Sequence, residues 1–322
     1  MTDVEVAMEL RLERYRGELT GYCYRMLGSA AEAEDAVQDA MIRAWRGQDG
    51  FEGRSALRSW LYRIATNVCL DALRSRKARA RPMDLAGPST VATASLAVLP
   101  EVTWIGPVPD ARVLTESGDP AEVAAQRESV RLALIAALQW LPPRQRAVLI
   151  LREVLAWRAS EVAELLDSTV ASVNSALQRA RATLATHEAA ATDPLRPLDP
   201  EQTALLARYV RAFEQYDMDA LAELLHEEAV MSMPPYALWL RGHADIRGWM
   251  TGPGAACASS RLLPTAANGA PAFAQYKPAP DGGHRPWALQ VLELSDGRIT
   301  GLHCFLDTDP LFPMFGLPAR LD

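Results

Sequence analysis

The stretch ASEVAELLDSTVASVNSALQRAR, residues 159–181, decides how the middle of this chain folds. Its apolar residues recur at helical spacing on both sides of a short polar turn, which is typical of a helix-turn-helix. The inner face consists of Val162, Leu165 and Leu166 in the first helix and Val173, Leu177, Ala180 and Leu184 in the second. We therefore predict two helices, over residues 160–166 and roughly 169–186.

The opposite face of the second helix carries polar side chains that can hydrogen-bond base edges and phosphates in a major groove. They are Ser172, Asn174, Ser175, Gln178 and Arg179. A plain helical hairpin with a solvated polar face would show the same periodicity. The short turn, the small residues beside it and the exposed Gln and Arg side chains favour DNA binding.

Helical spacing also runs from residue 6 to residue 81. Val37, Met41 and Trp45 stand at i, i+4 and i+8, and after the break GQDGFEGRS the helical spacing resumes. Eight Lys and Arg residues lie between Arg54 and Arg81 against a single acid. A local basic block of this kind indicates nucleic-acid contact even though the whole chain has a formal net charge of −7.

The length of 322 residues predicts two or three compact units, and 49% apolar with 23% charged residues excludes wholesale disorder. Residues 82–120 are rich in proline and acids and show no sustained period, which predicts a linker with one apolar island at residues 102–105. A second proline-rich linker is expected over residues 188–200. Beyond it, two helices over residues 201–216 and 218–225 precede strands, and residues 287–294 and 298–306 flank a Ser-Asp-Gly turn. This order is typical of an α+β fold.

Several classes of function are not expected. The four cysteines lie far apart and form no CxxC pair, so we expect no metal site and reduced thiols. The sequence shows neither the apolar core of a signal peptide nor an apolar run of about 20 residues. We therefore expect a cytoplasmic protein without a membrane partner.

Two blocks of sequence resemble a known family. The first is AEDAVQDAMIRAW (residues 33–45) with FEGR (51–54) and WLYRIATNVCLDALR (60–74), and the second is LPPRQRAVL (141–149) with the helix-turn-helix. Together they resemble regions 2 and 4 of a group 4, or extracytoplasmic-function, sigma factor of bacterial RNA polymerase. The remainder resembles a SnoaL-like domain of the NTF2 superfamily, through YVRAFE (209–214), DAL (219–221), MPP (233–235) and RG (241–242).

The resemblance implies two all-α sigma modules followed by a cone-shaped α+β domain. The implied divisions are sigma region 2 (6–81), a linker (82–120), sigma region 4 (121–187), a linker (188–200) and a SnoaL-like regulatory domain (201–318). The implied function is promoter-specific initiation of transcription with core RNA polymerase, bound through its β′ coiled coil and β flap, and with promoter DNA. An alternative is a DNA-binding regulator fused to a small-molecule-binding or cyclase/isomerase-like enzyme domain.

The resemblance also implies roles for particular residues. Polymerase would be bound by Asp35, Gln38 and Asp39, and the −10 element by Arg54, Arg58, Trp60, Arg63, Asn67 and Arg74. The arginines can neutralise phosphates, and Asn67 can read a base edge. Trp60 either supports an unpaired base or packs in the core beside Leu61 and Ile64. The −35 element would be read by the helix that ends the helix-turn-helix. Relatives often have a second basic residue where this helix has Asn174 and Ala176, so a lighter contact is expected.

For the C-terminal domain we expect a regulator without catalysis or cofactor, which packs on the sigma modules. A pocket for a small-molecule ligand is predicted from Trp239, Arg241, Trp287 and His303. His303 alternates with Ile299 and Phe305, so it is expected to point into an apolar interior. There a hydrogen-bonded core histidine is favoured over a general acid–base.

Overall fold

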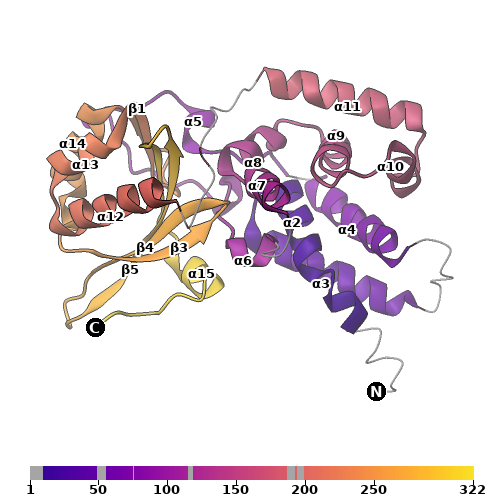
Figure 1. The fold of residues 1–322 in the computed structure, drawn as a ribbon, viewed down its shortest axis with the longest axis horizontal. Helices are drawn as coiled ribbons and strands as arrows, with labels where there is room; N and C mark the ends of the chain where they lie inside the picture. The colour runs from indigo at the N-terminus through magenta and orange to yellow at the C-terminus, as the bar shows by residue number, and fades with distance from the viewer. Residues whose placement is uncertain (1–9, 49–55, 75, 115–118, 187–192, 194–198) are drawn as a thin grey trace. The chain divides into compact units, whose positions relative to one another are not determined.

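The computed structural model describes residues 10–48, 56–74, 76–114, 119–186, 193 and 199–322. The chain divides into two compact units, which are described separately below. The first unit comprises residues 1–79 and 105–189, and the second comprises residues 80–104 and 190–322. Figure 1 colours both units along the chain, from indigo to yellow.

The described part of the first unit is built from helices. They are α2 (Arg16–Leu27), α3 (Ala30–Arg46), α4 (Leu57–Leu73), α6 (Asp110–Val113), α7 (Pro120–Glu128), α8 (Leu132–Gln139), α9 (Pro143–Leu149), the π-helical η3 (Ile150–Val154), α10 (Ala159–Leu165) and α11 (Val170–Ala185). Local sequence signals explain where several of these helices begin or end. Gly28 terminates α2 in a left-handed conformation with φ of 72°, and Ser29 then caps α3 by accepting from the amide of Glu32. Proline opens α9, where its missing amide hydrogen costs nothing.

Two buried arginines join helices from both ends of the first unit. Arg25 on α2 donates to the carbonyl oxygen of Ser129, at 3.1 Å, and Arg146 on α9 donates to the carbonyl oxygen of Met26 and to Gln139 Oε1. Burial lowers the pKa of each guanidinium to about 10, so both are charged at neutral pH. The two blocks of helices that the sequence separates by a linker therefore share one core.

The second unit contains a sheet covered by helices. Its elements are α5 (Pro82–Leu85), η2 (Glu101–Thr103), α12 (Pro200–Gln215), α13 (Met218–Leu224), β1 (Leu225–Ser232), β2 (Trp239–Arg241), α14 (His243–Thr251), η4 (Pro253–Cys257), β3 (Arg261–Ala267), β4 (Ala270–Pro278), β5 (His284–Ser295), β6 (Arg298–Phe305) and α15 (Thr308–Met314). The strand order is β2-β1-β6-β5-β4-β3, with β1 and β6 parallel and the other neighbours antiparallel. The predicted hairpin is β5–β6, and Asp296 and Gly297 supply its positive φ angles.

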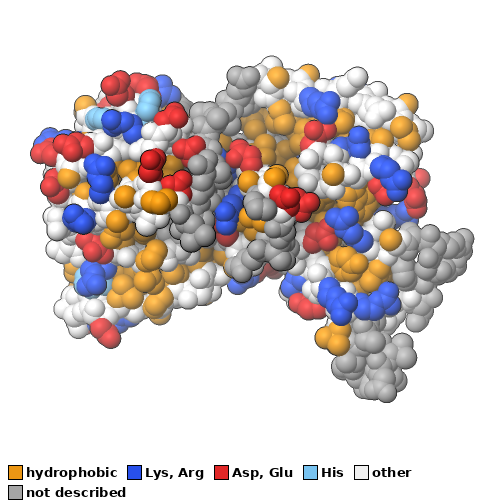
Figure 2. All heavy atoms as spheres, in the orientation of Figure 1, with side chains coloured by type: hydrophobic (Ala, Val, Ile, Leu, Met, Phe, Trp, Pro, Cys, Tyr) orange, Lys and Arg blue, Asp and Glu red, His pale blue; other side chains and the backbone are white. Residues whose placement is uncertain are grey.

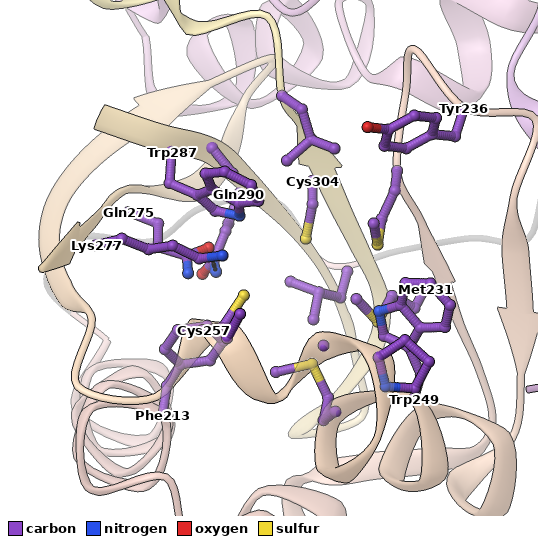
Figure 3. Close-up of a pocket in the computed structure, with 18 of the residues that line it drawn as sticks. Phe213, Met231, Tyr236, Trp249, Cys257, Gln275, Lys277, Trp287, Gln290 and Cys304 are labelled. Carbon is purple, nitrogen blue, oxygen red and sulfur yellow. Dashed lines mark hydrogen bonds between the residues drawn. The ribbon is translucent and has the colours of Figure 1, made fainter. Parts of the chain in front are cut away.

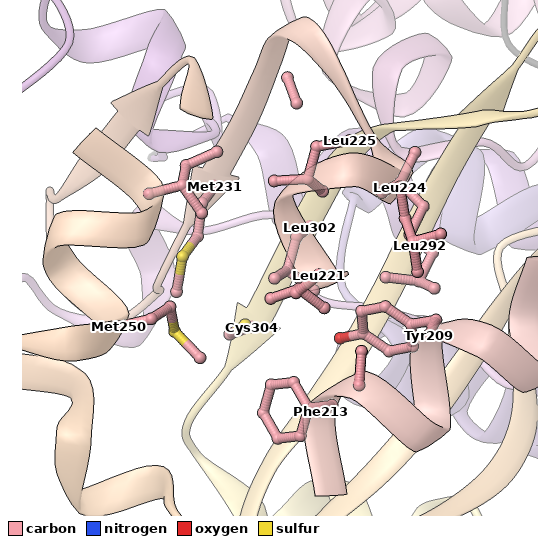
Figure 4. Close-up of a cluster of buried hydrophobic side chains, with 14 of the residues drawn as sticks. Tyr209, Phe213, Leu221, Leu224, Leu225, Met231, Met250, Leu292, Leu302 and Cys304 are labelled. Carbon is pink, nitrogen blue, oxygen red and sulfur yellow. The ribbon is translucent and has the colours of Figure 1, made fainter. Parts of the chain in front are cut away.

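Helices α12 and α13 bury their apolar faces on this sheet. Tyr209 and Phe213 of α12 and Leu221 of α13 pack with Leu292 and Leu302 of the two central strands. Figure 4 shows these side chains converging from the helices and the strands. One face of the sheet is thereby closed near α12 and α13, and the cavity described below lies farther along the same face.

The segment of residues 86–99, which the sequence predicts to be part of a linker, is attached to the second unit. The indole Nε1 of Trp239 donates to the carbonyl oxygen of Ala86 at 2.8 Å, and the amide of Ser89 donates to the carbonyl oxygen of Trp239 at 2.8 Å. The amide of Leu99 donates to the carbonyl oxygen of Pro235 at 3.0 Å. In the predicted apolar island, Trp104 is buried while Val102 is 57% exposed.

Candidate nucleic-acid interface and ligand cavity

Helix α11 presents the polar face that its sequence predicts. Thr169 caps its N-terminus, because its hydroxyl accepts from the amide of Ser172 at 3.1 Å. Val173, Leu177 and Ala180 are buried. All five predicted DNA-reading residues are exposed: Ser172, Asn174, Ser175, Gln178 and Arg179. The helix therefore offers a continuous row of hydrogen-bonding side chains, as major-groove recognition requires.

An apolar residue lies beside that row and was not predicted. Val170, in the first turn of α11, is 44% exposed. The N-terminal residues of a recognition helix contact base edges, and an apolar side chain there can contact a thymine methyl group. Its position three residues before the buried Val173 gives no sequence signal that it is exposed.

The predicted polymerase-binding residues share one face of α3. Asp35 and Gln38 are exposed, and Asp39 forms an ion pair of 2.7 Å with Arg43 one turn later. Ile42 lies on the same face, one turn beyond Gln38, and is 42% exposed. Ile42 was not among the predicted residues, although an apolar residue in an otherwise polar row marks a contact surface.

The predicted −10 residues on α4 differ in accessibility. Arg58 is half-buried: its guanidinium donates to Glu18 Oε1 at 2.7 Å through Nε, and Tyr62 donates to the same oxygen at 2.9 Å. The guanidinium carbon of Arg58 also lies 5.4 Å from the Tyr62 ring centre and 5.2 Å from that of Trp157. The half-buried Arg58 is thus already paired within the unit, with a carboxylate and two aromatic rings.

The other described residues of the predicted −10 set are more accessible. Asn67 is exposed, Arg74 pairs with Asp71 at 3.2 Å, and Arg63 lies 3.6 Å from the carboxylate of Glu164 on α10. Trp60 is half-buried, and a methyl group at Gly47 would lie 3.5 Å from its ring. Arg54 lies outside the described residues. On the face shown in Figure 2, Lys and Arg side chains are interspersed with Asp and Glu.

The second unit encloses a cavity of about 220 Å³. Its walls include Phe213, Met231, Trp249 and Leu302, and Trp287 contributes as the sequence predicts. Figure 3 shows Lys277, Gln275 and Gln290 extending to one side of the space. The cavity is therefore mainly apolar, with polar groups gathered at one side.

Three of the four residues predicted to form the pocket do not line this cavity. The Trp239 indole binds the carbonyl of Ala86, and the exposed Arg241 stacks on Trp239 at 5.2 Å. His303 is buried elsewhere, with its Nδ1 2.8 Å from Ser232 Oγ and its Nε2 3.4 Å from Glu293 Oε2.

The pocket prediction failed at His303 because of an irregularity in the strand. The pairing of β5 with β6 shifts between Glu293 and Leu294, where Thr300 is the extra residue. Strict alternation breaks there, so Ile299 joins the apolar cluster with Leu302 and Cys304, while His303 lies on the opposite face. Its buried hydrogen bond to Ser232 agrees with the expected hydrogen-bonded core histidine.

Within the described ranges, no group of three or more His, Cys, Asp or Glu residues is arranged to hold a metal ion. None of the helices described there has the length and hydropathy needed to span a bilayer.

Comparison with known proteins identifies the family. Residues 12–79 match Sigma-70 region 2, residues 131–184 match Sigma-70, region 4, and residues 206–302 match the SnoaL-like domain. The chain is 47% identical over 318 residues to the ECF RNA polymerase sigma factor SigG of Mycobacterium tuberculosis, an alignment that covers 96% of this chain and 83% of SigG. The chain belongs to the ECF RNA polymerase sigma factors.

Two further relatives extend the comparison. The ECF sigma factor SigW of Bacillus subtilis is 30% identical over 171 residues, covering 53% of this chain and 82% of SigW. The crystal structure of SigJ from Mycobacterium tuberculosis superposes with a TM-score of 0.60 at 22% identity, covering 96% of this ECF sigma factor and 99% of SigJ. The SigJ likeness confirms the predicted fold class of helical modules followed by an NTF2-like domain.

The family assignment also confirms the predicted function. This ECF sigma factor directs promoter-specific initiation of transcription, and it binds core RNA polymerase and promoter DNA. The relatives named above are all sigma factors.

Proposed function

We propose that this sigma factor reads the −35 element with α11, reads and melts the −10 element with α4, and contacts core polymerase through α3. The accessible face of α11 is the observation that carries this assignment. Ser172, Asn174, Ser175, Gln178 and Arg179 are all exposed, while the apolar residues between them are buried. Such a row can hydrogen-bond base edges and phosphates in a major groove.

The −10 element would be held by the accessible basic side of α4. Arg63 and Arg74 are exposed and can exchange their carboxylate partners for phosphates, and Asn67 can reach a base edge. Arg58 would join them only after it leaves Glu18. Arg54 and Trp60 complete the proposed set.

Polymerase binding would use both helical modules. On α3, the carboxylates of Asp35 and Asp39 and the amide of Gln38 suit the basic side chains of a β′ coiled coil, and Ile42 supplies an apolar centre. The region 4 helices would meet the β flap. The complex would act in the cytoplasm, where the polymerase works.

We infer that the SnoaL-like domain is a regulator without catalysis and that it takes a small-molecule ligand in its cavity. Its buried His303 supports this role, because it lies outside the cavity and its Nδ1 is engaged by Ser232. Residues 86–99 are hydrogen-bonded to this domain, so the domain is connected directly to the segment between the two sigma modules.

Run-off transcription with core polymerase tests whether α11 reads the −35 element. Arg179→Ala should reduce transcription from a promoter with a −35 element and flatten the salt dependence of promoter binding by about 0.9 units of slope per phosphate contact. Arg208→Ala, which removes an exposed arginine of α12, is the matched control and should leave both unchanged. Equal activity of the two variants would contradict the proposal that α11 recognises the promoter.

A further inference from the structure

One residue that lines the cavity comes from the segment between the sigma modules. Leu96 belongs to the attached stretch 86–99, lines the cavity and is 53% exposed. Backbone hydrogen bonds hold this stretch on either side, through the amides of Ser89 and Leu99. A molecule that fills the cavity therefore contacts the chain that connects the two DNA-reading modules.

Most polar groups around the cavity are already satisfied by one another. Tyr209 donates to Gln290 Oε1 at 2.7 Å, Gln290 Nε2 donates to Gln275 Oε1 at 2.9 Å, and Gln275 Nε2 donates to Ser260 Oγ at 2.9 Å. This run of hydrogen bonds fixes the orientation of both glutamine amides. Each of the two amides therefore has one N–H already bonded within the protein.

Lys277 differs from these groups. Its side chain is only 9% exposed, and its Nζ lies 3.3 Å from the centre of the Trp287 ring and beside the Cys257 thiol. Its register partner on β5 is another cation, Arg285. Among the residues that the structure describes, no carboxylate pairs with Lys277. Burial, with repulsion from Arg285, lowers the pKa of this lysine, so an entering anion would be stabilised there.

We propose that the cavity binds a small apolar carboxylic acid whose carboxylate pairs with Lys277 and whose apolar body contacts Leu96, so that residues 86–99 respond to the ligand. This rests on the regulatory role proposed above and assigns it a ligand class and a responding segment. The volume of about 220 Å³ sets the size. An apolar cavity of about 150 Å³ holds benzene, so one aromatic ring with a short acid chain fits.

Calorimetric titration of the full-length protein with two small molecules tests the ligand class. The probes are 3-phenylpropanoate and its neutral match, 3-phenylpropan-1-ol. The acid should bind roughly tenfold or more tightly than the alcohol, because a charge-assisted hydrogen bond exceeds a neutral one by that amount. Lys277→Met keeps the length of the side chain without its charge and should reduce the preference to about twofold.

Arg285→Met is the matched control for Lys277→Met, because it removes the neighbouring cation, which does not line the cavity. It should retain most of the preference for the acid. Equal affinity for acid and alcohol in the unaltered protein, or an undiminished preference in Lys277→Met, would overturn the assignment of Lys277. Failure of both probes to bind would overturn the cavity as a site for this class of ligand.

Hydrogen exchange of the same complex tests the response of the segment. Saturation with 3-phenylpropanoate should change the exchange of the Ser89 and Leu99 amides at least about threefold, an effect that Leu96→Ala should diminish. Unchanged exchange at both amides, with the acid bound, would refute the coupling. Transcription without any probe measures the sigma activity itself, so loss of that activity is distinguished from failure of the ligand proposal.

Discussion

The guanidinium of Arg58 lies 5.2 Å from the centre of the Trp157 ring, although Arg58 belongs to region 2 and Trp157 to region 4. A second contact joins the same modules, because Arg63 lies 3.6 Å from the carboxylate of Glu164. Both arginines are proposed to contact the −10 element. Engaging that element with both side chains would therefore break both of these contacts with region 4.

Glu18→Gln should strengthen binding of a −10 single strand to the holoenzyme. The change keeps the shape of the side chain but removes the carboxylate that pairs with Arg58, so the guanidinium is more available to a phosphate. We expect a gain of roughly two- to fivefold, the range for a partly exposed ion pair. Fluorescence anisotropy with a labelled oligonucleotide measures it. Glu13→Gln, which breaks the exposed pair with Arg16, should have no effect, and a gain in both variants would point to net charge instead.

Arg146→Ala should lower the free energy of unfolding by about 3 kcal/mol or more, because several buried acceptors lose a charged donor. These acceptors include the carbonyl of Met26 and the side chain of Gln139. Arg144→Ala, two residues away, loses one bond to the carbonyl of Leu166 and should cost about 1 kcal/mol. Urea unfolding compares the two. Similar losses would contradict a shared core between regions 2 and 4.

Val173→Asp and Ser172→Asp should separate stability from recognition. Val173 is 1% exposed, so a carboxylate there would destabilise the helix-turn-helix by about 3 kcal/mol or more. Ser172 is exposed in the first turn of α11, where an acid is tolerated with a change within about 0.5 kcal/mol. Its charge should nevertheless repel phosphates and abolish use of the −35 element. Thermal unfolding and run-off transcription measure the two effects, and a stable Val173→Asp variant would reverse the assigned orientation.

Ile42→Ser should weaken binding to core polymerase roughly tenfold through lost apolar contact. Because Ile42 is 42% exposed, its replacement should leave the fold intact. Val170→Ser removes an equally exposed apolar residue from α11 and should leave the affinity for polymerase unaltered. Competition for core enzyme measures both. Unchanged affinity in Ile42→Ser would restrict the contact to the polar residues of α3.

The affinity for 3-phenylpropanoate should fall at alkaline pH. Burial lowers the pKa of Lys277 below its usual 10.5, and the acid binds the protonated lysine. Affinity should therefore be constant from about pH 6 to neutrality, where the acid is ionised, and decline as pH rises through the lowered pKa. Cys257 and Arg285 face the same ammonium, so Cys257→Ala serves as a control for thiol ionisation. A decline of the same size in Lys277→Met would assign the pH dependence to another group.

Local periodicity predicted α11 well. A helix has a fixed repeat, so the positions of Val173 and Leu177 determine that Gln178 and Arg179 face outward. The hairpin at Asp296 and Gly297 was predictable for a similar reason, since its turn requires positive φ angles. Such features depend on neighbours within a few residues.

The environment of Arg58 was not predictable in this way. It depends on Glu18 and Trp157, which lie 40 and 99 positions away in the chain, and no periodicity in α4 identifies them. His303 shows a second reason. The extra residue Thr300 breaks the alternation of β6, so His303 and Ile299 lie on opposite faces of the sheet. The site residues on single helices were therefore placed more readily than those whose surroundings are built from distant segments.

The bond from the Trp239 indole to the carbonyl of Ala86 has a practical consequence for anyone who shortens this protein. Removing the SnoaL-like domain also removes the surface that anchors residues 86–99, and so lengthens the unanchored tether between the promoter-reading modules. A truncated protein would then differ in both respects at once. Trp239→Phe in the intact chain removes only the indole hydrogen bond to Ala86. It is the cleaner way to learn how this anchor limits the separation of the two modules.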